Sequence, residues 1–222
     1  MSTTLHTKDV VVAGVRSPVL IGGPTMSPAS NEAVVFVHGN PDAGGDWEPL
    51  MTRIADFATV VAPDMPGFGC ADKRADQDYT LAAYGAHLGG LIDQLGIRRV
   101  HLVTHDFGGP FALTWAARNV DRIASITLIN TGVLLDYRWH RLARVWRTPI
   151  AGELLMRLST PAITRAILRH DNPGLPEEWV DRIAGHLVPP GTKRAVLRLY
   201  RSTRPADMDA LVAPLRQRIR TR

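Results

Sequence analysis

The sequence predicts an α/β fold with a mostly parallel sheet, flanked by helices and followed by an all-helical cap. From about residue 31 onwards, short runs of β-branched and apolar residues alternate with longer segments whose apolar residues recur at helical spacing. After residue 133 the strand-like runs stop, and only helical patterns and turns follow up to residue 204. With 222 residues, 45% of them hydrophobic and 21% charged, the chain is long and apolar enough to bury a core.

Four short runs have the composition of buried strands. They occupy residues 33–37, 59–62, 100–104 and 123–129. The first run ends at His-Gly-Asn-Pro (38–41), and the second ends at Pro-Asp-Met-Pro-Gly-Phe-Gly (63–69). Since glycine and proline gather at both ends, we expect a loop after each of these two strands.

Two helices lie between the predicted strands. Residues 79–95 carry apolar side chains at helical spacing, with Thr80 near the start and Gly96 just after the end, and both are preferred residue types at those helix termini. Residues 108–118 form the second helical segment, directly after the third strand. Strands and helices that alternate in this order are typical of parallel α/β units.

The segment after the fourth strand has helical patterns at 137–145, 150–168, 177–186 and 192–202. A helical insertion that follows a sheet strand has the form of a lid over a binding site. We therefore divide the chain into the N-terminal part of a core at 1–133, a helical cap at 134–204, and a return to the core with a basic tail at 205–222.

Charge and hydropathy exclude several classes of protein. No apolar run approaches the ~20 residues that cross a bilayer, and the N-terminus lacks the apolar segment of a secretory signal. The single cysteine, Cys70, cannot form an intrachain disulfide, which fits a cytoplasmic location. Four arginines in the last eight residues supply most of the +5 net charge, and the other basic residues are dispersed among acids. We expect neither nucleic acid nor a membrane as a partner.

The most informative segment is Val-Thr-His-Asp-Phe-Gly-Gly at 103–109, where the third strand meets its helix. A nucleophile at such a junction lies on a sharp turn that raises its side chain above the sheet, and Gly108 and Gly109 allow the turn to close. Asp106 stands where the G-x-S-x-G motif has serine. The alternative is that Asp106 is only the N-cap of the helix.

A carboxylate at this position predicts a particular chemistry. It displaces a leaving group from saturated carbon, and water then opens the resulting ester at the carboxylate carbon. Small apolar epoxides and alkyl halides are natural substrates for such a nucleophile. The His-Gly-Asn-Pro loop supports this prediction, because the backbone N–H groups near Asn40 and of Phe107 can form an oxyanion hole for ester hydrolysis.

The three ordered motifs at 38–41, 64–69 and 104–109 resemble those of the epoxide hydrolase and haloalkane dehalogenase branch of the α/β-hydrolases, over about residues 34–202. The resemblance implies the α/β-hydrolase fold with Asp106 as the nucleophile. It places Asn40 and Phe107 at the oxyanion-hole positions. It also implies positions on the substrate side for His38, Pro41 and His105.

The resemblance leaves two substrate classes open. His-Gly-Asn-Pro is similar to dehalogenases, in which the asparagine side chain helps to hold the halide, but Phe107 stands where they have a tryptophan N–H donor. His105 before the nucleophile and Gly-Gly after it look more like epoxide hydrolases. Tyr200, in Leu-Tyr-Arg at 199–201, resembles their ring-polarising tyrosine, and Tyr137 is a candidate for a second donor. The leading interpretation is an epoxide-hydrolase-like enzyme, and the alternative is a dehalogenase-like one.

The resemblance also implies a histidine that activates water, located after the cap, and an acid that orients this histidine. No strand-like run and no histidine follow residue 204, so we expect a chain truncated at its C-terminus, with the final strands missing. Asn130 is neutral where some dehalogenases have a carboxylate, and Asp136 is the nearby acidic substitute. His38 and His105 are the alternative bases.

Two further hypotheses compete with an active enzyme. One is a shortened, non-catalytic relative that keeps the pocket, and the other is an unstable fragment of a broken reading frame. An exposed sheet edge would then offer a route to homo-oligomers. No metal-ligand cluster, phosphate loop or dinucleotide fingerprint is present in the sequence, so no metal or cofactor is expected.

Overall fold

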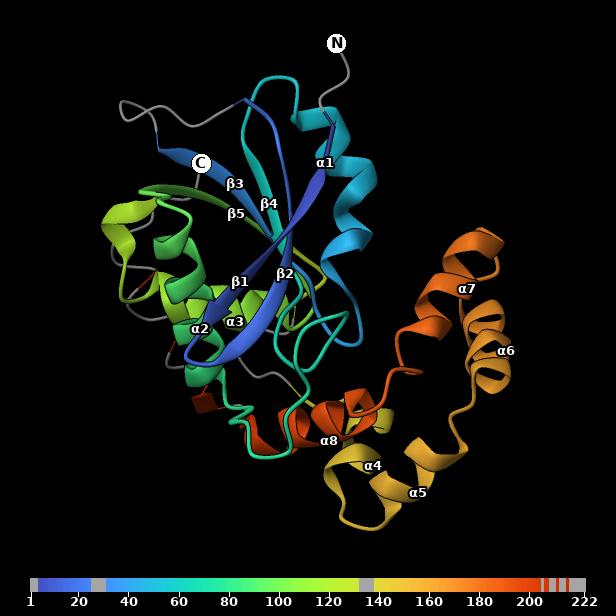
Figure 1. Ribbon diagram of the computed structural model, residues 1–222. Coiled ribbons are helices and arrows are strands. Elements are labelled where there is room, and N and C mark those ends of the chain that lie inside the picture. The colour runs from blue at the N-terminus through green and yellow to red at the C-terminus, as the bar shows by residue number, and fades with distance from the viewer. Residues whose placement is uncertain are drawn as a thin grey trace.

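The computed structural model describes residues 4–24, 31–131, 138–204, 206, 207, 211 and 215. Within them lies a six-stranded sheet with the strand order β1-β2-β4-β3-β5-β6 (Figure 1). Its strands are β1 (His6–Val12), β2 (Val15–Gly22), β3 (Glu32–Val37), β4 (Val60–Pro63), β5 (Arg99–His105) and β6 (Ile123–Ile129). The last four strands pair in parallel, which confirms the mostly parallel α/β sheet.

Helices cover both faces of this sheet (Figure 1). α2 (Leu81–Gln94) and α3 (Gly108–Ala116) pack together on one face. The short 3-10 helix η1 (Gly44–Trp47) and α1 (Glu48–Ile54) lie on the other. Apolar side chains fill both layers, so the sheet is buried between them.

Local sequence sets the ends of α2. The hydroxyl of Thr80 accepts the N–H of Ala83 at 3.3 Å, as an N-cap residue does. Gly96 follows the helix with a φ of 72°, a conformation that glycine adopts without steric cost. Inside the core, the ring of Tyr84 on this helix stacks on Phe111 of α3, with centroids 3.9 Å apart. The predicted helix therefore forms, and its apolar face joins α3.

The β1–β2 hairpin is a feature that the sequence pattern did not predict. Its turn residues, Ala13 and Gly14, have φ values of 50° and 77°, and two positive φ values are characteristic of a two-residue type I′ turn. Pro18 lies within β2, opposite Asp9 of β1. A proline inside a run argues against a strand on the basis of sequence alone. Here Pro18 lies one residue before the β2–β4 ladder, which starts at Val19, and only its carbonyl is used on that side, by the N–H of Asp64.

The helical segment (residues 138–204) follows β6. It contains α4 (Arg141–Arg147), α5 (Ala151–Leu158), α6 (Pro161–Asp171), α7 (Glu177–Gly185) and α8 (Thr192–Ser202). The single helix predicted at 150–168 is wrong, because Thr160 and Pro161 start a new helix: Thr160 caps it by accepting the N–H of Ile163. The boundary predicted at 133/134 lies outside the described residues.

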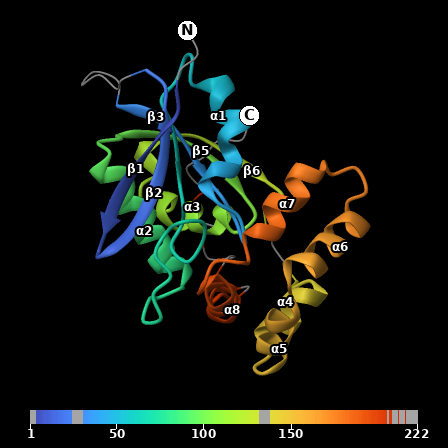
Figure 2. The same cartoon turned by 45° about the vertical axis from the view of Figure 1, so that its right-hand side comes forward.

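In both views, α4, α5 and α8 lie below the sheet, while α6 and α7 extend to the side of it (Figures 1 and 2). No helix of the described residues is long and apolar enough to cross a membrane.

β6 forms one edge of the sheet within the described residues. Leu128 and Ile129 near its end are 46% and 40% exposed. Unpaired edge strands of this kind can pair with another chain, so the homo-oligomer expected from the sequence stays a prediction for this edge.

Candidate active site

Asp106 lies on a strained turn between β5 and α3. Its φ of 50° falls in the left-handed region that non-glycine residues seldom adopt. The turn is anchored to the end of β6, because its N–H donates to the carbonyl of Ile129 at 3.3 Å and its carbonyl accepts the hydroxyl of Thr131 at 2.7 Å. The N-cap of α3 is Phe107, so the alternative that Asp106 merely caps this helix is wrong.

Glycines around the turn are required by close packing. A Cβ on Gly108 would lie 2.1 Å from the carbonyl oxygen of Val37, and one on Gly109 would lie 2.0 Å from Oγ1 of Thr131. A Cβ on Gly39 would lie 2.4 Å from the Cβ of Asp106 itself. The loop after β3 and the turn after β5 are therefore in direct contact, and only residues without a side chain fit between them.

The carboxylate of Asp106 contacts the predicted oxyanion-hole amide. The N–H of Asn40 donates to Oδ1 of Asp106 at 2.9 Å. Burial raises the pKa of Asp106 above its ordinary value, although the N–H groups of Phe107 and Asn40 lower it. The structure thus brings Asp106, Asn40 and Phe107 together as the sequence predicted.

His38 supports the loop rather than facing open space. Its Nδ1 contacts the carbonyl of Gly39 at 2.8 Å, and its Nε2 accepts the N–H of Met65 at 2.8 Å. The ring is 1% exposed. Both nitrogens are therefore occupied by backbone groups, and His38 holds the Asn40 loop against the loop after β4.

The motif at 64–69 also holds neighbouring loops in place, through the carboxylate of Asp64. Asp64 accepts the N–H of Gly44 at 2.7 Å and the N–H of Cys70 at 2.6 Å. A Cβ on Gly69 would lie 2.4 Å from the carboxylate of Asp64, so this position requires glycine. The carboxylate joins the loop after β4 to η1, next to the loop that carries Asn40.

Asp42 is a residue that the sequence argument missed. Its Oδ2 lies 3.0 Å from Nδ1 of His105 and accepts the N–H of Gly39 at 3.3 Å. The hydrogen bond to Asp42 raises the pKa of His105, although burial acts in the opposite direction. Asp42 lies only two residues after Asn40, but nothing in the sequence around it indicates a contact with His105, 63 residues further along the chain.

A cavity of about 260 Å³ lies between the Asn40 loop and the helical segment. Asn40 and Pro41 line it from the core, and apolar side chains of α4, α5, α6, α7 and α8 line the rest. Nδ2 and Oδ1 of Asn40 and Nε1 of Trp146 are buried without a hydrogen-bond partner in the described part of the chain. Such groups are costly to bury, which points to a ligand in this cavity.

Tyr200 of α8 packs over the residue that follows Asp106. Its ring is 3% exposed and meets Phe107 edge-on, with centroids 5.0 Å apart. Trp139 stacks on the same Phe107 ring at 6.3 Å. The predicted Tyr200 therefore lies next to Phe107, whereas Tyr137 and Asp136 lie outside the described residues.

A second cavity of about 240 Å³ shares Ile183 of α7 with the first. His105, Asp42 and Asp46 line it together with Trp179 and Ile183 of α7. Asp46 approaches Nε of Arg182 at 2.6 Å and Nε2 of His186 at 2.8 Å, so it connects the core to α7. Burial raises the pKa of Asp46, but His186, the Ala43 N–H and Arg182 together lower it below its ordinary value. His105 thus faces a different cavity from Asn40.

Comparison with known proteins gives a family match and relatives that include haloalkane dehalogenases. A model of the alpha/beta hydrolase fold matches residues 32–158. A haloalkane dehalogenase of Mesorhizobium japonicum is 29% identical over 226 residues, which cover 93% of this chain and 72% of the relative. A haloalkane dehalogenase of Agrobacterium fabrum is 34% identical over 48% of this chain and 34% of its own length. The chain therefore spans only part of the length of these relatives.

Solved structures agree with this result. Cfl2 from Burkholderia cenocepacia superposes with a TM-score of 0.79 at 25% identity, over 94% of this chain and 75% of that one. Haloalkane dehalogenase DbeA from Bradyrhizobium elkani superposes with a TM-score of 0.74 at 25% identity, over 97% of this chain and 76% of that one. Epoxide hydrolase CorEH has the same fold. It superposes with a TM-score of 0.69 at 19% identity, over 95% of this chain and 77% of that one. The resemblance predicted from the three motifs is confirmed, and the chain belongs to the alpha/beta hydrolase fold family.

Proposed function

We propose that this protein is a hydrolase that forms a covalent alkyl ester on Asp106 and that its substrate is a small apolar alkyl halide. The observation that carries the proposal is the Asp106 turn, in which the N–H of Asn40 holds Oδ1 at 2.9 Å. We assign the attack to Oδ2. This oxygen forms a bond to the substrate carbon while the carbon–halogen bond breaks and the halide leaves with the electron pair.

The second step uses the same amide. Water attacks Cγ of the ester, and negative charge develops on Oδ1, which already accepts the N–H of Asn40. The bond between Cγ and Oδ2 then breaks, and the alcohol leaves with Oδ2 and one proton of the attacking water. The second proton of that water is released to solvent as the carboxylate re-forms. The carboxylate is restored with one oxygen from water.

Three observations support a halide as the leaving group. A departing halide needs N–H donors but no proton, and the buried amide of Asn40 offers such donors to an otherwise apolar cavity. Trp146 also lines that cavity, and its Nε1 is a second buried N–H without a partner in the described part of the chain, so we assign to it the donor role that Phe107 lacks. The proteins compared above include three that are named haloalkane dehalogenases.

An epoxide is the second candidate substrate, and the position of Tyr200 beside Phe107 favours it. Opening an epoxide leaves an alkoxide that requires a proton, and a phenol next to the nucleophile can supply it. Tyr200 is buried and packs against Phe107, directly after Asp106. The leading interpretation from the sequence thus becomes the alternative, because it depends on one tyrosine whereas the halide is supported by two N–H donors and by the relatives.

Mass spectrometry of the peptide that contains Asp106 tests the proposal. We expect an alkyl adduct after incubation with short bromoalkanes, accompanied by one bromide released per adduct. Asp106→Ala is the matched variant and forms none. In H₂¹⁸O, label is expected in the Asp106 carboxylate after a turnover, and the first alcohol released carries the unlabelled Oδ2.

Two variants separate the substrate classes. Asn40→Ala keeps the backbone N–H that holds Oδ1 of Asp106 but removes the side-chain N–H donors. It is expected to slow adduct formation from bromoalkanes about 100-fold, the scale seen when one N–H donor to a developing negative charge is removed. Tyr200→Phe should leave that reaction unchanged but slow the reaction with 1,2-epoxyalkanes of the same chain length. A folded protein that binds these compounds without any adduct at Asp106 would instead be a non-catalytic binding module.

A further inference from the structure

Large apolar side chains are exposed along α4, α5 and α6. Ile150, between α4 and α5, is 81% exposed, and Leu154 and Leu158 of α5 are 58% and 56% exposed. The others are Leu142 and Val145 of α4 and Ile163 and Ile167 of α6. We name these seven residues the apolar face. α4 and α5 pack together, and large exposed apolar patches on soluble proteins mark interaction sites.

Arginines accompany the apolar face. Residues 138–204 contain 13 Lys and Arg but five Asp and Glu, a net charge of +8. Three of these acids are already paired with arginines of the segment: Glu153 with Arg201, Glu177 with Arg169, and Asp181 with Arg165. Within the described part of the chain, no ion pair involves the exposed residues Arg138, Arg141, Arg144 and Arg157. The charge of these four arginines is therefore available to an external partner.

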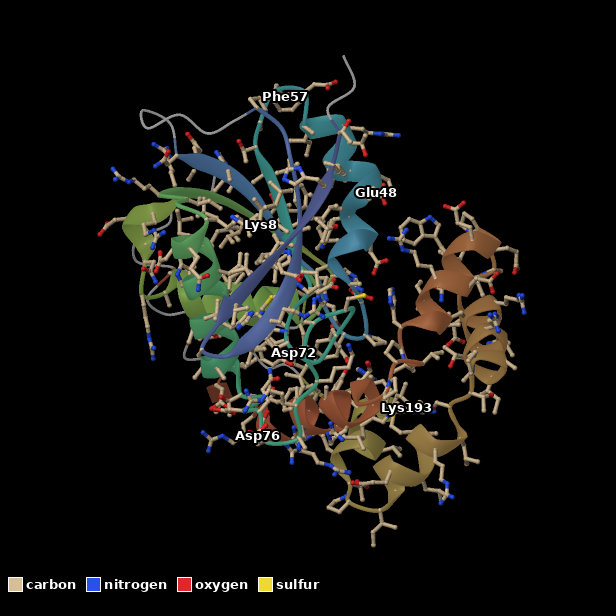
Figure 3. All side chains as sticks on the ribbon, in the orientation of Figure 1. Lys8, Glu48, Phe57, Asp72, Asp76 and Lys193 are labelled. Carbon is tan, nitrogen blue, oxygen red and sulfur yellow. The ribbon has the colours of Figure 1, made fainter. Side chains whose placement is uncertain are left out.

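The position of these helices allows them to reach a flat surface. α4 and α5 lie at the lower end of the molecule in both ribbon views, on the side away from α1 (Figures 1 and 2). Phe57, an apolar residue that is 74% exposed, lies at the opposite end in the orientation of Figure 1 (Figure 3). The exposed aliphatic side chains and the unpaired arginines of α4 and α5 thus lie together at this end of the molecule.

We propose that the apolar face docks on the surface of an anionic phospholipid bilayer. Short amphipathic helices lie in the plane of such a surface, with aliphatic side chains below the headgroups and arginines against the phosphates. A second copy of this chain is disfavoured as the occupant, because a symmetric contact would bring the unpaired arginines of both copies together. The aliphatic side chains among the arginines also favour lipid over nucleic acid.

The same residues connect the docking surface to the cavity beside Asn40. Leu142, Leu158, Ile163 and Ile167 belong to the apolar face and also line the 260 Å³ cavity. An apolar compound dissolved in the bilayer reaches this cavity along aliphatic side chains. This last step rests on the proposed function, whereas the docking does not. The docking concerns the surface of a bilayer, whereas the expectation that no membrane is a partner rested on the absence of a spanning segment.

Co-sedimentation of the full chain with vesicles tests the proposal. We expect binding to vesicles of phosphatidylcholine with about 30% phosphatidylserine, little binding to phosphatidylcholine alone, and weaker binding as salt is raised. Ile150→Glu with Leu154→Glu is expected to lower the affinity about ten-fold or more, because two aliphatic side chains no longer enter the interface. Arg141→Glu with Arg157→Glu should lower it about as much.

Matched controls come from the opposite end of the molecule. Phe57→Glu and Arg53→Glu change an exposed aromatic and an exposed cation near the end of α1, and they are expected to leave the affinity unchanged. Circular dichroism verifies that each variant is folded. The proposal is overturned if the folded wild type does not bind the anionic vesicles, or if the control variants lose as much affinity as the others. It is also overturned if duplex DNA binds more tightly than the vesicles and Ile150→Glu leaves both affinities unchanged.

Discussion

Oδ2 of Asp42 lies 3.0 Å from Nδ1 of His105, which precedes Asp106 in the chain. The same oxygen accepts the N–H of Gly39, the residue before Asn40. One carboxylate therefore joins the loop that supplies the oxyanion-hole amide to the end of β5 that carries Asp106. We infer that Asp42 sets the separation between Asn40 and Asp106.

Asp42→Asn is expected to slow adduct formation at Asp106 about ten-fold, because small displacements of reacting groups are costly to the rate. It should also lower the pKa of His105, since the neighbouring carboxylate is what raises it. NMR titration of the His105 ring and the rate with a bromoalkane measure the two effects. Asp9→Asn, which removes an exposed partner of Arg16, is the control and should change neither. A His105 pKa that is the same in Asp42→Asn and wild type contradicts the assignment.

Adduct formation is expected to depend on the ionisation of Asp106. Burial raises the pKa of this carboxyl, and only the carboxylate can attack. The rate constant should therefore fall as the pH decreases through this pKa, by about ten-fold per pH unit below it, with a midpoint above the usual ~3.9 of aspartate. Single-turnover rates across the pH range in which the protein stays folded provide the measurement. A rate that remains constant down to pH ~4 is inconsistent with the raised pKa.

The turn at Asp106 could be predicted because its signals are local. A β-rich run, an acid, two glycines and a helical pattern follow one another at 100–118, and the structure places β5, Asp106 and α3 there. The break between α5 and α6 also had a local signal, Thr160 followed by Pro161, which the apolar periodicity on either side concealed. Local chemistry thus determined these elements.

Long-range contacts were not predictable in the same way. Asp42 acts through His105, which lies 63 residues further along the chain, and no pattern near Asp42 indicates that pairing. β2 contains Pro18 and pairs with β4 through residues 19–22, so its assignment depends on a partner strand about 40 residues away. Sheet register and side-chain pairing of this kind follow from tertiary packing and not from the propensity of a segment.

Gly39→Ala is expected to slow adduct formation about 100-fold, because the new Cβ would lie 2.4 Å from the Cβ of Asp106 and the two must separate. The free energy of unfolding is expected to fall as well, by about 1–3 kcal/mol, the usual cost of an overpacked site. Adduct rates and urea unfolding of the same samples distinguish the two effects. Gly174→Ala is the matched control, since its Cβ would meet nothing within 4 Å, and it should behave as wild type. Equal rates for both variants would show that Gly39 tolerates a side chain.

His87 provides a separate test of the core. It lies on α2, 6% exposed, with Nε2 2.8 Å from the hydroxyl of Ser17 on β2. Burial lowers the pKa of this imidazole from 6.5 to about 4. Between these two values the unfolded chain binds a proton that the folded protein does not, so acid favours unfolding.

We therefore expect the contribution of His87 to stability to be complete above pH ~6.5 and to be lost progressively as the pH falls toward ~4, by about 3 kcal/mol in total. Urea unfolding at intervals across this range measures it. His87→Gln keeps a hydrogen-bonding group for Ser17 but does not titrate, so its free energy of unfolding should fall less steeply with acid than that of the wild type. If the free energies of unfolding of wild type and His87→Gln change in parallel with pH, the imidazole is protonated equally in the folded and unfolded states. Its burial against Ser17 then does not determine the acid sensitivity of the fold.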